Sequence, residues 1–305
     1  MQSARLDRLD SLRLRAAVRL RKLLVKGAGL LPDETRRRLE RRLRGREEAL
    51  QIAGSRAFVV SCAKSGRTWL HVMLDAYEEA SGRDLGVFFT HDNYIRDVTG
   101  GDGRPWHAGK RTVVLARHPA DIAVSMFHHW RHRMTPRKRW INRYPDPARD
   151  IAMFDFVLRE AAGMKHAIAL LNRWADEIRD RDDALMVRYE DMRADPRREL
   201  ARIVRFLDGA ADEAAIASAV EYGSFENMQR REREAAVAPD APRQLRPGDV
   251  SNPQSFKARS GEAGGWRRQF DADQVSQIDA LVAANLDPYY GYAPSAAPAA
   301  GAAGR

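Results

Sequence analysis

The stretch Phe58-Val-Val-Ser-Cys-Ala-Lys-Ser-Gly-Arg-Thr-Trp-Leu70 begins as an apolar strand and then turns into a loop that carries Lys64 and Gly66. The apolar run that follows has the spacing of a helix over residues 68–80. In such a unit the glycine lets backbone amides turn inward, the helix presents its positive N-terminus, and the lysine adds a mobile charge. The loop therefore has the composition of a phosphate-binding loop. The chain contains no Walker A sequence, and a Ser-Gly turn that only caps a helix is the alternative at this point.

Strand–helix units recur along the chain and predict the fold class. Runs rich in β-branched residues, without alternating polar residues, are typical of a parallel sheet that helices cover on both faces. The predicted strands are residues 56–61, 111–116 and 184–188, and the helices predicted after them are residues 68–80, 120–133 and 196–207. One further helix is predicted over residues 154–179. We therefore expect an α/β protein with a central parallel sheet flanked by helices.

The positive charge is concentrated near the N-terminus. The chain has 305 residues, a formal net charge of +10 and 44% hydrophobic residues. Residues 1–50 contain 15 Lys and Arg but only seven Asp and Glu, so eight of the ten net charges lie there. The rest of the chain is close to neutral, so nucleic acid is not expected as a partner of the main body.

Residues 4–26 and 33–50 have the spacing of two basic amphipathic helices. Two interpretations are open: attachment to an anionic membrane surface or acidic partner, or a solvated helical hairpin packed on the main domain. Arginines interrupt the leucines between Leu12 and Leu24, so no signal peptide is expected. The single cysteine, Cys62, suits a reducing compartment. The expected location is the cytoplasm, with the chain either free there or peripheral at the inner face of the membrane.

The other predicted strands also end in polar residues. Ligands of an open parallel sheet bind beyond the carboxyl ends of its strands. Arg117 follows the strand at 111–116, and Ser125 lies in the first turns of the next helix, so these two side chains could close on a second anion. Tyr189 follows the strand at 184–188. Two candidate anion sites at one edge of a sheet favour a ligand site over isolated surface residues.

Five segments together resemble the sulfotransferases that use 3′-phosphoadenosine 5′-phosphosulfate. Residues 63–69 resemble the Pro-Lys-Ser-Gly-Thr-Thr-Trp loop of that family, and residues 113–125 resemble its 3′-phosphate motif, an apolar strand that ends in Arg with Ser eight residues later. Residues 189–192 are similar to its Tyr-Glu-Asp-Met segment, Ser224-Phe225 to its Ser-Phe pair, and residues 259–266 to its C-terminal Arg-Lys-Gly…Gly-Asp-Trp motif. The segments occur in the family's order between residues 56 and 270.

The resemblance implies a single P-loop-like domain over residues 54–292. The basic helices form an extension at 1–50 before it, and the Ala-, Pro- and Gly-rich composition at the end of the chain predicts a disordered tail at 293–305. The resemblance also implies 3′-phosphoadenosine 5′-phosphosulfate as co-substrate and no metal. The residues implied for the 5′-phosphosulfate are Lys64, Ser65, Gly66, Arg67 and Thr68, and those for the 3′-phosphate are Arg117, Ser125, Arg259, Ser260 and Gly261. Trp69 and Phe225 are implied to sandwich the adenine, and Tyr189 to line the nucleotide pocket.

The family also implies a catalytic pair. Its general base is a histidine that follows a strand between the two phosphate motifs, and His91 after residues 87–90 has that position. Lys64 is implied to stabilise the leaving oxygen. The competing histidines are His71, His107, His118, His128 and His129.

The chain departs from the family pattern at several positions. Ala63 replaces a Pro, Arg67 a Thr, Ser260 a Lys and Gly265 an Asp, while Phe89 stands where many relatives have a Lys. The segment 131–150 is basic, aromatic and broken by prolines, and it is predicted to be a lid or to face the acceptor; the alternative is that it clamps the cofactor. The expected acceptor carries a hydroxyl or amine on a glycan, glycolipid or small metabolite. The alternatives are a P-loop-type nucleotide kinase, or a lipid- or nucleic-acid-binding protein that uses its basic N-terminal arm.

Overall fold

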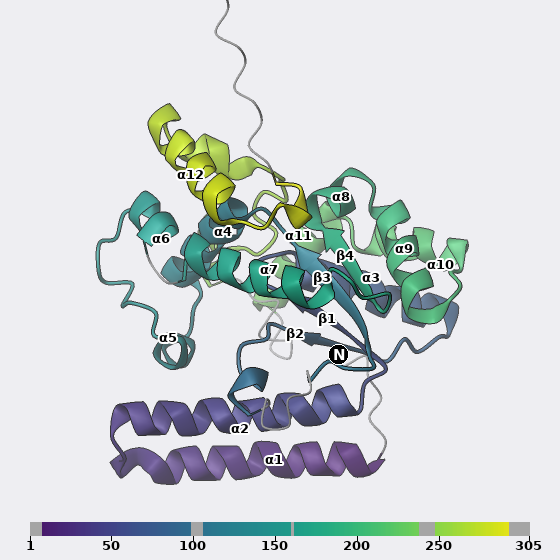
Figure 1. Cartoon of the computed structure of the whole chain (residues 1–305), viewed down its shortest axis with the longest axis horizontal. Helices are drawn as coiled ribbons and strands as arrows, with labels where there is room; N and C mark the ends of the chain where they lie inside the picture. The colour runs from purple at the N-terminus through teal and green to yellow at the C-terminus, as the bar shows by residue number, and fades with distance from the viewer. Residues whose placement is uncertain (1–7, 99–105, 160–161, 238–247, 293–305) are drawn as a thin grey trace, which may run out of the picture.

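A computed structural model describes residues 8–98, 106–159, 162–237 and 248–292 (Figure 1). Its centre is a parallel sheet of four strands in the order β2-β1-β3-β4. The strands are β1 (Ala57–Ser61), β2 (Val87–Thr90), β3 (Arg111–Ala116) and β4 (Ala184–Arg188). Val59 of β1 pairs in register with Phe89 on one side and Val113 on the other. The predicted parallel sheet is confirmed, and the residues after each strand meet at one edge of it.

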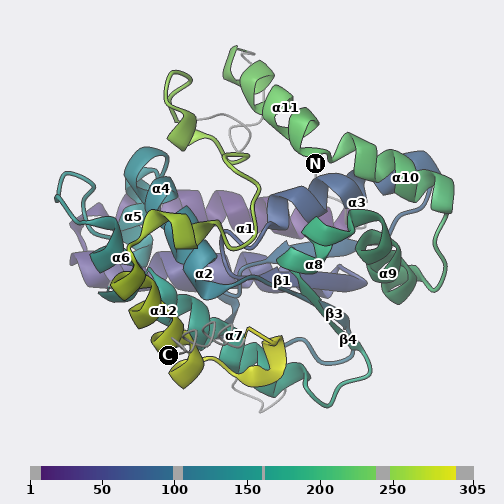
Figure 2. The same ribbon diagram turned by 90° about the horizontal axis from the view of Figure 1, so that it is seen from above.

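Helices cover both faces of the sheet (Figure 2). On one face lie α3 (Arg67–Ser81), α9 (Pro196–Asp208) and α10 (Glu213–Tyr222), and on the other lie α4 (Pro119–His132) and α7 (Met164–Ile178). Val59 and Leu115 pack toward the first group, while Phe58 and Val114 pack toward the second. Because both faces are buried, the strands are apolar throughout and show no alternation.

The helix predicted over residues 154–179 is wrong as a single element. The structure has α6 (Met153–Arg159) and α7 in its place. Gly163 precedes α7, and a Cβ built there would lie 2.5 Å from the carbonyl oxygens of Phe156 and Val157. The chain folds back against α6 at that point, and a glycine is needed for so close an approach of two backbone segments.

Four further helices and several short 3₁₀ turns complete the described part of the fold. The helices are α5 (Pro136–Asn142), α8 (Tyr189–Ala194), α11 (Phe225–Val237) and α12 (Ala272–Asn285). Short 3₁₀ turns lie at Ala28–Leu30, Ile95–Asp97, Pro253–Ser255, Gly265–Gln269 and Pro288–Tyr290. The tail predicted at 293–305 lies outside the described residues, as do residues 238–247.

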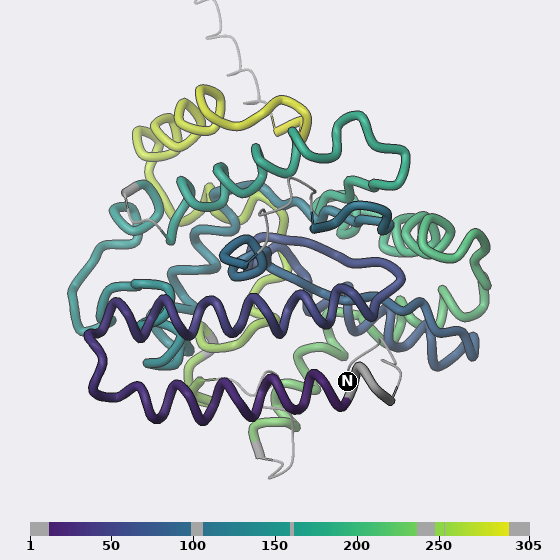
Figure 3. Tube along the Cα trace, turned by 60° about the horizontal axis from the view of Figure 1, so that its bottom comes forward, coloured from purple at the N-terminus to yellow at the C-terminus, as the bar shows by residue number. Residues whose placement is uncertain are grey.

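The N-terminal helices α1 (Arg8–Gly27) and α2 (Asp33–Ala53) form a hairpin (Figure 3). In the view of Figure 1, α2 lies between α1 and the rest of the chain. Glu40 of α2 is fully buried and pairs with arginines on three helices. The distances are 3.8 Å to Arg21 of α1, 2.9 Å to Arg44 of α2 and 2.8 Å to Arg137 of α5. The hairpin is therefore joined to α5. No helix among the described residues combines the length and apolar character needed to cross a membrane.

Candidate active site

A cavity of 960 Å³ opens at the carboxyl edge of the sheet. The loop after β1, the residues after β2, helices α2, α4, α5 and α7, and residues 254–262 contribute to its wall. Its lining contains 15 Lys and Arg but four Asp and Glu. A wall with this excess of cations lowers the free energy of a bound anion, so the cavity fits an anionic ligand.

The loop after β1, residues 63–68, has the backbone of an anion-binding loop. Lys64 and Gly66 both adopt left-handed conformations, with φ of 80° and 92°. A Cβ on Gly66 would lie 2.5 Å from Cδ2 of Tyr189, so a side chain there meets the aromatic ring. Ser65 is fully buried, and its Oγ has no hydrogen-bond partner within the described part of the chain. An unpaired buried hydroxyl is costly, which favours a ligand oxygen as its partner.

Lys64 stands among other cations. Desolvation in the wall, together with repulsion from Arg133, Lys257 and Arg117, lowers the pKa of Lys64 to about 7. Desolvation and Arg133 likewise lower the pKa of Lys257 to about 8. The lowered pKa values of these two lysines indicate a site with too little negative charge to balance its cations. A bound phosphate or sulfate would supply that negative charge.

Arg117 ties the loop to two other segments. Its Nη1 donates to the carbonyl oxygen of Lys64 at 3.1 Å, and its Nη2 donates to that of Glu262 at 2.9 Å. The guanidinium lies over the ring of Tyr189, 4.2 Å from its centroid, and Tyr189 Oη donates to the carbonyl oxygen of Gly261 at 3.2 Å. The ends of β1, β3 and β4 are therefore connected to the segment at 259–262.

The aromatic residues predicted for the adenine also lie in the wall. Trp69 Nε1 donates to the carbonyl oxygen of Gly223 at 2.7 Å, and the Trp69 ring meets Tyr189 edge-on with 5.8 Å between centroids. Phe225 lies against Gly261, where a Cβ would be 2.8 Å from Cδ2 of the ring. The predicted site residues that line the cavity are Lys64, Gly66, Arg67, Thr68, Trp69, His91, Arg117, Ser125, Tyr189, Phe225, Arg259, Ser260 and Gly261; Ser65 is buried in the loop beneath them.

His91 follows β2 and has a defined tautomer. Its Nδ1 lies 2.9 Å from the carbonyl oxygen of Ser61. A carbonyl oxygen only accepts, so Nδ1 carries the proton and Nε2 keeps a lone pair. Burial, with a smaller contribution from Arg67, holds the pKa of His91 well below its usual range. The neutral imidazole is therefore the stable form near neutral pH, as a proton acceptor requires.

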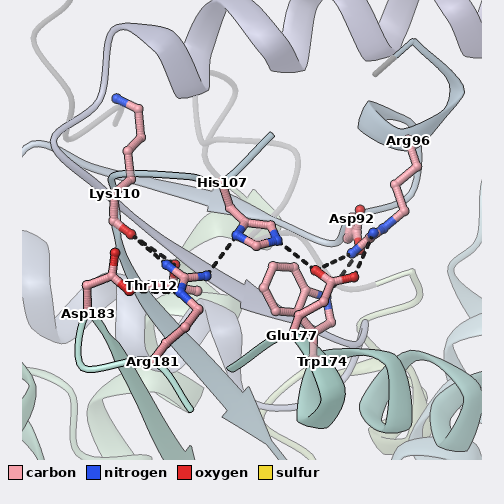
Figure 4. A network of polar contacts seen from close by, with 9 residues as sticks. All are labelled: Asp92, Arg96, His107, Lys110, Thr112, Trp174, Glu177, Arg181 and Asp183. Atoms are coloured by element: carbon pink, nitrogen blue, oxygen red, sulfur yellow. Dashed lines mark hydrogen bonds and ion pairs between the residues drawn. The ribbon is translucent and has the colours of Figure 1, made fainter. Parts of the chain in front are cut away.

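A polar network fixes the turn after His91 (Figure 4). Asp92 adopts a left-handed conformation with φ of 53° and accepts from Arg96 Nε at 2.6 Å and from Trp174 Nε1 at 3.1 Å. Arg96 also donates to Glu177 at 3.0 Å. Glu177 in turn accepts from His107 Nε2 at 2.8 Å. The other ring nitrogen of His107 accepts from Arg181 at 2.7 Å, so both nitrogens are occupied and His107 has a structural position.

Comparison with known proteins identifies the family. Residues 106–289, more than half of the chain, match the family model described as the sulfotransferase domain. The chain belongs to the sulfotransferase family. The match begins beyond the loop at 63–68, so the likeness of that loop rests on its own residues.

Curated sulfotransferases share about a quarter of their aligned residues with this family member. Sulfotransferase 1C2 of Rattus norvegicus is 27% identical over 178 residues, which cover 58% of this chain and 54% of that protein. Cytosolic sulfotransferase 10 of Arabidopsis thaliana is 24% identical over 186 residues, which cover 58% of this chain and 50% of that protein. The chain thus spans about half the length of the curated relatives that it matches.

Solved structures share the fold. Mouse sulfotransferase SULT7A1, crystallised in complex with PAP, has a TM-score of 0.52 and 20% identity, over 76% of this chain and 84% of that chain. Retinol dehydratase in a complex with retinol and PAP has the same TM-score and identity, over 84% of this chain and 88% of that chain. The α/β fold of the sulfotransferases is therefore shown for this family member.

The other histidines of the family member differ in their surroundings. The ring of His118 stacks on Trp266 with 5.3 Å between centroids, and its Nδ1 accepts the backbone N–H of Ala120. His71 stacks on Phe89 at 4.2 Å. His128 and His129 of α4 line the cavity, and burial lowers their pKa values to about 4 and about 2. Among the described residues, no group of three or more His, Cys, Asp and Glu side chains is placed to hold a metal ion.

Two buried carboxylates that the sequence reasoning missed hold the C-terminal part of the site. Glu232 of α11 accepts the backbone N–H of Lys257 at 2.8 Å and of Ala258 at 2.7 Å, and it lies 3.4 Å from Arg133. Asp121 accepts the backbone N–H of residues 264 and 266 at 2.7 and 3.1 Å. The position of Asp121, four residues after the strand-end residue Arg117, indicates a place near the site. Glu232 lies among several charged residues of α11, and nothing in its sequence position distinguishes it from them.

Helix α2 is also part of the site, which its sequence did not indicate. Four of its arginines line the cavity: Arg37, Arg38, Arg41 and Arg44. Arg41 Nη2 donates to the carbonyl oxygen of Asn93 at 2.8 Å, two residues beyond His91. Glu48 accepts a hydrogen bond from the hydroxyl of Thr90, which directly precedes His91. The helical hairpin therefore contacts the chain on both sides of His91.

Proposed function

We propose that this chain transfers a sulfuryl group from 3′-phosphoadenosine 5′-phosphosulfate to a hydroxyl or amine of an acceptor, with His91 as general base. The observation that carries the proposal is a single cationic cavity that contains the loop at 63–68, Arg117 with its partners, and His91 in the tautomer of a proton acceptor. Membership of the sulfotransferase family supports the same reaction.

The roles follow from the contacts. Lys64, the amides of the loop and Ser65 Oγ are suited to the 5′-phosphosulfate, while Arg117, Ser125, Arg259, Ser260 and Gly261 are suited to the 3′-phosphate. Trp69 and Phe225 offer aromatic faces for adenine, beside Tyr189. Lysine, arginine and backbone amides supply the positive field, and the proposal includes no metal.

The proposed step forms a bond between the acceptor oxygen and sulfur. It breaks the bond between sulfur and the bridging phosphate oxygen, and the electron pair of that bond stays on this oxygen. The acceptor proton passes to Nε2 of His91, and Lys64 stabilises the charge on the leaving oxygen. The products are the sulfated acceptor and adenosine 3′,5′-bisphosphate.

The acceptor is proposed to be polar or anionic, such as a glycan, a glycolipid or a small metabolite. The wall that α2, α5 and α7 contribute is not used by the proposed nucleotide site, and it carries Arg41, Lys138 and Arg173 among its cations. The segment at 131–150, predicted to face the acceptor, supplies α5 to this wall. Lys138 lies close enough to His91 to lower the pKa of the imidazole, and a cation at this position favours an acceptor with carboxylate, sulfate or phosphate substituents.

Calorimetric titration tests the nucleotide part of the proposal. Adenosine 3′,5′-bisphosphate is expected to bind more tightly than ATP or AMP, and Lys64→Ala and Arg117→Ala are each expected to weaken it at least about tenfold. Preference for ATP, or binding indifferent to both substitutions, would refute the sulfotransferase site.

A second measurement tests His91. Asparagine can keep the donation to Ser61 but cannot take up the acceptor proton. His91→Asn is therefore expected to bind the bisphosphate as the wild type does, while turnover with any acceptor found by screening with labelled co-substrate falls about 10²- to 10⁴-fold. If His129→Asn lost turnover and His91→Asn did not, the base would be assigned to α4.

A further inference from the structure

The outer side of the N-terminal hairpin exposes a row of leucines. Of the eight large hydrophobic side chains that are exposed in the described part of the chain, six lie between residues 12 and 31. They are Leu12, Leu20, Leu23 and Leu24 on α1 and Leu30 and Leu31 at the turn, with exposed fractions from 41% to 100%. Singly exposed leucines are ordinary, but six on one hairpin form a patch that water solvates poorly.

The leucines of α1 share one face. Leu20, Leu23 and Leu24 are three and four residues apart, and Leu12 lies eight residues before Leu20, so helical geometry places them on one side. The opposite side of α1 is used within the protein. Leu14 and Arg21 are buried there, and Arg21 Nε donates to Glu47 of α2 at 2.7 Å. The leucine face therefore points away from α2, and α1 is the outermost helix on the side of the hairpin (Figure 1).

Cations border the leucine face on one side. Arg19, Lys22 and Lys26 are exposed, and each lies within about 100° of Leu23 around the helix axis. Residues 11–31 contain no Asp or Glu. A stripe of leucines bordered by Lys and Arg, on a helix too polar to cross a bilayer, is the arrangement of helices that lie in the plane of an anionic membrane surface.

We infer that α1 and the turn at Ala28–Leu30 dock on an anionic lipid bilayer. The leucines enter the boundary between headgroups and acyl chains, and Arg19, Lys22 and Lys26 lie at the level of the lipid phosphates. A second copy of the chain is the weaker occupant, because a two-fold contact through the leucines would bring two basic borders together without acidic partners. Since neighbouring helices pack about 8–10 Å apart, α2 and the cavity wall would lie one helix above the surface.

The experiment is co-sedimentation of the full chain with vesicles. The protein is expected to bind vesicles of phosphatidylcholine mixed with phosphatidylglycerol, to bind phosphatidylcholine alone at least about tenfold more weakly, and to be released by salt. The double variant Leu20→Ser with Leu23→Ser is expected to lose binding about tenfold or more. Lys22→Glu with Lys26→Glu is expected to lose it at least about 30-fold.

Val250→Ser is the matched control, because Val250 is an exposed hydrophobic residue that does not belong to the hairpin, and its loss is expected to change nothing. All variants are expected to bind adenosine 3′,5′-bisphosphate as the wild type does, since α1 lies outside the cavity wall. This readout separates a failure of the docking surface from a failure of the proposed function. The inference is overturned if the protein binds both kinds of vesicle equally, or if it binds neither. It is also overturned if the leucine variant binds as the wild type does. A dimer in solution that the leucine variant dissociates would assign the face to a second copy.

Discussion

Protonation of Lys64 is expected to control nucleotide affinity. In the free protein, desolvation and the neighbouring cations lower the pKa of Lys64 to about 7, so the amine is half neutral at that pH. An anionic phosphate in the loop would restore the pKa toward its ordinary value and keep the lysine charged in the complex. Binding above pH 7 therefore takes up a proton, and the affinity falls as the pH rises.

The size of the effect follows from the lowered pKa. If Lys64 is charged in the complex throughout, the Kd for adenosine 3′,5′-bisphosphate rises about 50-fold between pH 7 and pH 9, or about 2.3 kcal/mol. Lys257 has a pKa of about 8, so the Kd rises by a further factor of up to about ten if Lys257 also takes up a proton when the nucleotide binds. The pKa values of His91, His128 and His129 are all lowered, so these groups are neutral in the free protein over this range.

Titration calorimetry in buffers with different ionisation enthalpies measures both the Kd and the proton uptake. Lys64→Arg keeps a cation that does not titrate in this range, so its Kd is expected to depend much less on pH. Lys257→Arg is the matched control and is expected to keep the dependence that comes from Lys64. A wild-type Kd that is constant from pH 7 to pH 9, or the same slope in Lys64→Arg, would refute the reasoning.

Three further predictions concern Gly66, Glu232 and Glu40. Gly66→Ala is expected to lower the free energy of unfolding by about 2–5 kcal/mol, because the new Cβ meets Tyr189 and the backbone is left-handed; Gly82→Ala, with a similar φ and open space, is expected to cost only about 1–2 kcal/mol, and equal losses in urea denaturation would contradict the clash. Glu232→Ala leaves the backbone N–H groups of residues 257 and 258 unpaired, so the free energy of unfolding is expected to fall by about 2–4 kcal/mol. Adenosine 3′,5′-bisphosphate is expected to bind at least about tenfold more weakly to this variant. Unchanged binding would show that residues 257 and 258 do not contribute to the nucleotide site. Glu40→Gln removes the carboxylate charge that pairs with three arginines, and the free energy of unfolding is expected to fall by about 1–3 kcal/mol. A denaturation midpoint equal to that of the wild type would show that these ion pairs do not stabilise the fold.

The sequence by itself determined the features that depend on neighbouring residues. The apolar strands, the glycine in the loop after β1 and the polar residues at strand ends are local patterns, and they were enough to predict the parallel sheet and a shared edge for Lys64, Arg117 and Tyr189. Local patterns suffice because strand periodicity, glycine conformation and helix N-termini are set over a few residues.

Tertiary structure alone decided the features that join distant segments. The tautomer of His91 depends on the carbonyl oxygen of Ser61, and the position of residues 257 and 258 depends on the carboxylate of Glu232. The arginines of α2 look like part of a solvated hairpin in sequence, yet four of them line the cavity because α2 packs beside the end of β2. The break before α7 likewise depends on how closely Gly163 approaches the carbonyl oxygens of α6. Hydrogen bonds and close contacts of this kind depend on distances in space, and a pattern along the chain carries no information about which remote residue will be the partner.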